Sequence, residues 1–130
     1  NTGAFWTVNP GRHGFEQYRP NGELVSSWYR PSMELEGFCG CCNPAHAAFR
    51  SDGTLVTAEK GLARVKLHSV DQKLLGLIAE PKAFRVAEPG PFSAELETPL
   101  LDLAVDAQDR ILIVDANKNA IRVFQVKEQG

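Results

Sequence analysis

The chain gathers its three cysteines into four residues, as Cys39, Cys41 and Cys42. Thiolates are ligands that suit zinc and iron–sulfur clusters, and His46, four residues after Cys42, would add a fourth ligand. The spacing differs from the paired C-x2-C motifs of standard zinc sites. One interpretation is therefore a metal or redox site with Cys39, Cys41, Cys42 and His46 as its candidate ligands.

The same cysteines have two other interpretations. A disulfide between Cys39 and Cys42, or a vicinal bond between Cys41 and Cys42, would suit an oxidising, extracytoplasmic compartment and leave one thiol over. Cysteine is also small and apolar, so the three side chains can simply fill the tight inner end of a sheet. Residue types and spacing leave these interpretations open, and the cofactor stays undefined: an iron–sulfur cluster, zinc or none.

The elements that would position these residues come from a threefold internal repeat. Its copies cover residues 3–9 with 15–18, 52–59 with 65–68, and 109–115 with 121–124. The alignment superposes Asn9, Glu59 and Asp115, at successive offsets of 50 and 56 residues. Self-similarity at about 40–50 residues, with short apolar runs between turn residues, is typical of β-propeller blades.

Apolar runs between Gly, Pro, Asn and Asp turn signals predict an all-β chain of about three blades made of antiparallel strands. We assign blade one to residues 1–35, blade two to 43–80 and blade three to 99–126, with an irregular connection over 80–98. The expected strands cover residues 4–8, 15–19, 23–28, 45–50, 54–58, 64–69, 73–79, 100–106, 110–114 and 120–126. No helix is expected.

Only blade two is complete in this assignment. Because the first strand of a propeller blade lies innermost, blade one would lack its inner strand and blade three its outer strand. The open sheet edges would pair with another chain or aggregate. We therefore expect a partial or half propeller, completed by the remaining blades of the same ring or by a protein partner.

The composition excludes two classes of partner. A net charge of −2 and a pI near 5.9 do not provide the basic face that nucleic acids require. No apolar run approaches the roughly 18 residues that cross a membrane. The sequence also lacks a glycine-rich phosphate loop and a serine elbow, so no catalytic residue is assigned.

The repeat resembles the NHL family of six-bladed β-propellers. The residues that carry the resemblance are 101–106, 111–115 and 121–124, together with 43–48 and 63–67 in blade two. The stretch Gly37-Phe38-Cys39-Gly40-Cys41-Cys42-Asn43-Pro44 is similar to a poorly characterised bacterial subgroup of that family. NHL propellers serve as interaction platforms, sensors and occasionally metal-dependent enzymes, so the resemblance implies a fold and leaves the function open.

Strand direction in such blades predicts which loops share a face. The connection that enters a first strand and the loop after the second strand lie on the same face, near the mouth of the central channel. This places the cysteines and His46 on the face that also holds the following residues: Asn9, Glu59, Lys60, Asp102 and Asp115. His46 aligns with Asp102, so both are expected near the channel mouth. The turns at Asp52 and Asp109 are expected on the opposite face.

Other prominent residues favour structural roles. His13 and His68 are expected at the surface, Glu59 and Lys60 as a local polar pair, and the tryptophans between blades. Two functions remain. The first is a non-catalytic propeller that binds protein or scaffolds a larger assembly; the alternative is a metal or redox site at the Cys-x-Cys-Cys motif.

Overall fold

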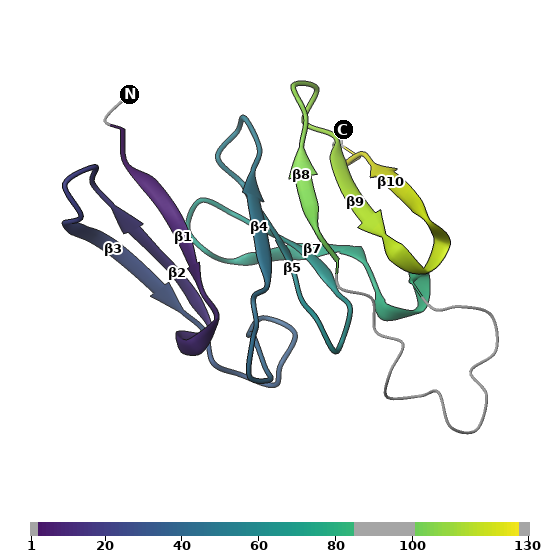
Figure 1. The fold of residues 1–130 in the computed structure, drawn as a ribbon, viewed down its shortest axis with the longest axis horizontal. Coiled ribbons are helices and arrows are strands. Elements are labelled where there is room, and N and C mark those ends of the chain that lie inside the picture. Colours follow the sequence, from purple (N-terminus) through teal and green to yellow (C-terminus); the bar gives the residue numbers. More distant parts are fainter. Residues whose placement is uncertain (1–2, 85–100, 128–130) are drawn as a thin grey trace. The chain divides into compact units, whose positions relative to one another are not determined.

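The computed structural model describes residues 3–84 and 101–127, which form an all-β protein of three antiparallel sheets (Figure 1). The first sheet contains β1 (Phe5–Asn9), β2 (Gly14–Tyr18) and β3 (Leu24–Tyr29). The middle sheet contains β4 (His46–Phe49), β5 (Leu55–Ala58), β6 (Val65–His68) and β7 (Leu74–Ala79). The last sheet contains β8 (Leu103–Val105), β9 (Ile111–Asp115) and β10 (Ala120–Phe124).

The predicted all-β class is confirmed, and every observed strand lies inside an expected one or extends at most one residue beyond it. The helices of the described residues are short 3-10 turns at Pro10–Arg12, Pro81–Ala83 and Ala116–Lys118. Most of the expected connection, from residue 85 to residue 98, lies outside the described residues, as does the start of the strand expected at 100–106.

The chain divides into two compact units, Asn1–Ala45 and His46–Gly130. The N-terminal unit contains the first sheet and an aromatic cluster. Phe15 stacks on Trp28 with ring centroids 5.3 Å apart, and Phe38 meets both rings edge-on at 5.9 and 5.8 Å. Because Phe38 is fully buried, it fixes the segment after the first sheet to that sheet. Trp28 therefore packs within its own unit.

In the C-terminal unit the middle sheet packs on the last sheet. One hydrophobic cluster joins Val56, Val65 and Leu67 of the middle sheet to Ile111 and Ile113 of the last sheet. At about 25 cal/mol per Å² of apolar surface removed from water, burial of this kind supplies the main force that holds two such sheets together.

Strands β4 and β8 lie side by side in this unit (Figure 1). Nδ1 of His46, at the start of β4, is 3.3 Å from Oδ1 of Asp102, just before β8. The backbone N–H of Ser51, after β4, donates to Oδ1 of Asp109, after β8, at 2.7 Å. The first strands of these two sheets therefore run in the same direction.

The three hairpins of the repeat share one register. Val8 pairs with Phe15, Ala58 with Val65, and Val114 with Ile121, each across seven residues. The first and last hairpins also turn in the same way, through a 3-10 turn that begins after Asn9 or Asp115. The side chain of each of these residues accepts a hydrogen bond from the backbone three residues on.

The β4–β5 turn lies at the opposite end of β4 from His46, as the expected strand order requires. Asp52 accepts from the Thr54 backbone N–H at 2.9 Å, and Asp106 accepts from those of Gln108 and Arg110 at 2.9 Å. Both aspartates therefore form the Asx-type turns that close these hairpins.

Candidate functional site

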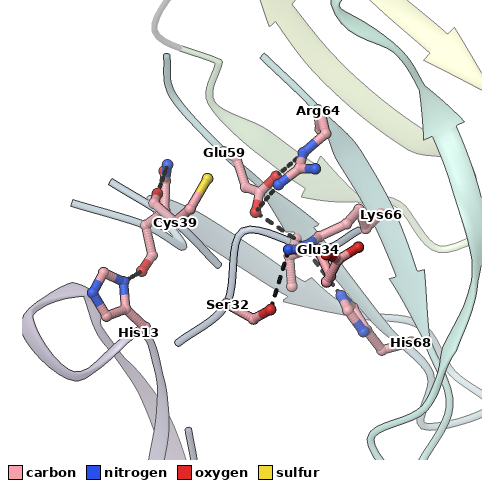
Figure 2. Close-up of polar contacts among 10 residues, drawn as sticks. His13, Ser32, Glu34, Cys39, Glu59, Arg64, Lys66 and His68 are labelled. Carbon is pink, nitrogen blue, oxygen red and sulfur yellow. Dashed lines mark hydrogen bonds and ion pairs between the residues drawn. The ribbon is translucent and has the colours of Figure 1, made fainter. Parts of the chain in front are cut away.

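The cysteine segment is anchored on both sides in the N-terminal unit. Phe38 is buried in the aromatic cluster, and the Asn43 side-chain amide donates to the Cys39 carbonyl at 2.8 Å. Nδ1 of His13 lies 3.2 Å from the Asn43 carbonyl oxygen (Figure 2). His13 is thus a half-buried partner of this segment, where a surface position was expected.

The sulfur atoms of Cys41 and Cys42 lie 3.2 Å apart. Cys41 is exposed, whereas Cys39 and Cys42 are half-buried. All three lie in the described part of the chain, and none forms a disulfide there. Two adjacent thiols at the surface form a dithiol that a thiophilic atom can bridge.

Within residues 3–84 and 101–127, no three His, Cys, Asp or Glu side chains come together in a way that would hold a metal ion. His46 belongs to the other compact unit from the three cysteines. The four-ligand site of Cys39, Cys41, Cys42 and His46 therefore remains a prediction.

His46 and Asp102, which the repeat alignment superposed, come together in the C-terminal unit at 3.3 Å. The Asp102 side chain is two-thirds exposed and that of His46 one-third exposed. A polar contact at such exposure contributes little to stability. The contact does locate the end of the two sheets at which β4 and β8 begin side by side.

A polar pair recurs in all three hairpins, at the aligned position and seven residues later. The Asn9 amide donates to Oε1 of Glu16 at 2.9 Å. Lys66 donates to Oε1 of Glu59 at 3.0 Å, and Nη1 of Arg122 lies 3.6 Å from Oδ2 of Asp115. Asn9, Glu59 and Asp115 were all predicted on the channel-mouth face. The side chain of each therefore contacts the next strand of its own sheet.

The pair in the middle sheet is completely buried. Glu59 is 1% exposed and Lys66 is 0% exposed, and Arg64 also contacts the Glu59 carboxylate through Nε and Nη2 (Figure 2). Glu59 was expected to form a local polar pair with Lys60 at a strand end, and its carboxylate contacts Lys66 and Arg64. A buried charge needs a countercharge, and Glu59 is enclosed by two of them. Lys60 is half-buried in the same loop.

His68 was expected at the surface, and this prediction is wrong. The imidazole is fully buried, and its Nε2 lies 3.2 Å from the Thr57 hydroxyl. The strand pattern explains the burial: His68 shares one face of the middle sheet with Thr57 and Lys66, and this face is buried as well as the apolar one.

In the first sheet, Glu16 is the acceptor of a hydrogen-bond network. The hydroxyls of Tyr29 and Tyr18 donate to its two carboxylate oxygens, the latter at 2.7 Å, beside the bond from Asn9. Hydrogen bonds from Tyr29 and then Tyr18 lower the pKa of Glu16 below its usual value. The guanidinium of Arg12, 5.5 Å above the Tyr29 ring, adds to the same effect.

The lowered pKa predicts a loss of stability in acid. A carboxyl whose folded pKa lies below its unfolded pKa, about 4.3 for glutamate, stabilises the fold above that pH and loses this contribution as the pH falls through the folded pKa. We expect Glu16→Gln to flatten the decline of the unfolding free energy below about pH 5. Urea denaturation at a series of pH values from neutral to acid measures the free energy of unfolding, with Glu23→Gln at an exposed carboxylate as control. Equal slopes for wild type and Glu16→Gln would contradict the network.

Sequence reasoning missed Glu16, Lys66 and Arg122 as partners of the aligned residues. The signal was present, because each is a charged residue seven positions after Asn9, Glu59 or Asp115. An alternating strand pattern assigns charged residues to solvent, which is why the pairs escaped notice.

A search of known protein families found no family model that matches the chain, and no curated protein matches it.

Proposed function

We propose that the chain is a non-catalytic interaction or scaffold module built from NHL-type propeller blades. The middle and last sheets pack on one another, and the last sheet offers an exposed apolar face to a protein partner. The repeat, its common hairpin register and its recurring polar pair support blades of one kind.

The observation that carries the proposal is the way the middle sheet packs on the last sheet. The repeat alignment superposes Leu55 and Thr57 on Ile111 and Ile113, and Val56 on Leu112. The middle sheet uses the face of Val56, whereas the last sheet uses the face of Ile111 and Ile113. Two equivalent sheets therefore meet through opposite faces, which is the packing that lets blades follow one another around a ring.

The other face of the last sheet is apolar and exposed. Val114 is 44% exposed, Ile121 65% and Val123 54%. Three exposed aliphatic side chains on neighbouring strands form a contiguous patch, and such patches mark interaction sites. We call Leu112, Val114, Ile121 and Val123 the open face.

Photo-crosslinking tests the proposal. A photoreactive phenylalanine analogue at Val123 is compared with one at Val70, which is 71% exposed in the β6–β7 turn. In extract of the cells that make the protein, the analogue at Val123 should capture a discrete protein species that the analogue at Val70 does not. Capture of no protein from Val123, or equal capture from both positions, would contradict an interaction module.

A second candidate function rests on the 3.2 Å contact between the Cys41 and Cys42 sulfur atoms. It is a thiol site for a redox or metal ligand, such as zinc or an iron–sulfur cluster, since soft thiolates select such ligands. Phenylarsine oxide is a probe for a dithiol, because its arsenic bonds two sulfurs and its oxygen leaves as water with the two thiol protons.

We expect phenylarsine oxide to protect two of the three thiols from alkylation, as counted by mass spectrometry. Cys42→Ser should remove this protection, and Cys39→Ser, the matched control, should keep it. Three thiols that alkylate equally with and without the arsenical would exclude a dithiol site and leave the packing interpretation.

A further inference from the structure

The open face occupies positions that are buried elsewhere in the chain. Leu112, Val114, Ile121 and Val123 align with the buried residues Val56, Ala58, Val65 and Leu67 of the middle sheet. These four middle-sheet residues are at most 7% exposed, because the last sheet covers them. The open face therefore has the same position on the last sheet as the face of the middle sheet that the last sheet covers.

The occupant that such a face binds is defined by the packing within the C-terminal unit. The covering sheet uses Ile111 and Ile113 of one strand and Phe124 of the next, beside the Asp115–Arg122 pair. An equivalent surface needs an apolar or aromatic pair in place of Ile111 and Phe124, and a polar pair that lies within its own sheet.

The first sheet carries aromatic residues at two of the three positions, with Thr7 in place of Ile113, and Phe5 is exposed. Phe5 aligns with Ile111, and its cross-strand partner Tyr18 aligns with Phe124. The rings of Phe5 and Tyr18 stack with centroids 6.1 Å apart, and Phe5 is 48% exposed. The polar pair of this sheet, Asn9 and Glu16, is closed by its own hydrogen bond.

We infer that a second copy of this chain binds the open face through its first sheet. This inference rests on the proposed function and names the partner. Each chain then holds both halves of the contact, the open face on β9 and β10 and the Phe5–Tyr18 surface on β1 and β2. The contact is head to tail, because the two halves are different surfaces.

Sedimentation of the purified full chain tests this with three variants and two matched controls. Ile121→Lys disables the open face and Phe5→Lys disables the Phe5–Tyr18 surface, with Val123→Lys as a second open-face variant. Val70→Lys and Met33→Lys place the same charge at other exposed apolar residues, which are 71% and 77% exposed. Circular dichroism checks that each variant keeps its strands.

We expect the mass of wild type and of both controls to rise with concentration above the 14.3 kDa of one chain. Each face variant alone should stay at that mass. An equimolar mixture of Phe5→Lys and Ile121→Lys should form a two-chain complex, since one intact copy of each surface remains.

Other results would overturn the inference. If Ile121→Lys and Val123→Lys stay single while Phe5→Lys associates like wild type, the open face binds itself or another surface. If the mixture does not associate, the contact is not head to tail. If wild type is a single chain and the analogue at Val123 still captures a different protein, the partner is not a second copy and the proposed interaction module stands. If wild type is a single chain and the analogue captures no protein, both proposals fail.

Discussion

Glu59→Gln should destabilise the protein by about 3–5 kcal/mol, the cost of removing one partner from a buried ion pair. The carboxylate is 1% exposed and contacts both Lys66 and Arg64, with the Lys66 ammonium 3.0 Å from Oε1. The variant leaves two cations in the interior with one countercharge fewer. Urea denaturation at neutral pH measures the change in the free energy of unfolding.

Two further variants make this result specific. Glu23→Gln removes a carboxylate whose ion pair with Arg19 is more than half exposed, and it should cost within about 1 kcal/mol. Adding Lys66→Met to Glu59→Gln removes the buried ammonium and should recover a large part of the loss. Equal effects of Glu59→Gln and Glu23→Gln would show that the buried pair does not stabilise the middle sheet.

Gly14→Ala should have the next largest effect, a loss of about 3 kcal/mol in the stability of the first sheet. A Cβ at Gly14 would lie 1.8 Å from the Trp28 carbonyl oxygen and 2.8 Å from the Tyr29 Cα. Both are backbone atoms of the paired strand β3, so β2 and β3 cannot keep their register. Thermal unfolding monitored by Trp fluorescence reports the loss.

Gly76→Ala is the matched control, because it is also a strand glycine but a Cβ there meets no atom within 4 Å. We expect a change of less than about 1 kcal/mol, with either sign, since alanine restricts the unfolded chain more than glycine does. A Gly14→Ala variant as stable as Gly76→Ala would mean that the β2–β3 contact differs from the one described.

The sequence predicted the strands well because the repeat fixed them three times over. Asn9, Glu59 and Asp115 align in sequence. In the structure Asn9 ends β1 and Asp115 ends β9, and Glu59 directly follows the equivalent strand β5. Turn residues such as Asp52 and Asp106 set the hairpin ends through local hydrogen bonds, so one sequence is enough to place them.

The site was predicted less well, because burial depends on long-range packing. Periodicity cannot reveal that both faces of the middle sheet are buried, so His68 was expected at the surface and the cross-strand partners of Glu59 were missed. The pairing of His46 with Asp102 followed from the alignment, since equivalent residues of neighbouring first strands lie at one end. The 3.2 Å contact of Cys41 and Cys42 depends on the conformation of one loop, which spacing alone does not determine.

The central claim is that the open face binds protein, and the accessibility of its methyl groups tests this most directly. A soluble paramagnetic probe broadens the NMR signals of methyl groups that it can approach. In the assembled protein, the methyls of Ile121 and Val123 should be as protected as those of buried Val56, while Val70 stays accessible. If Ile121 and Val123 remain as accessible as Val70 at every concentration and with every captured partner, the open face binds no protein and the account is wrong.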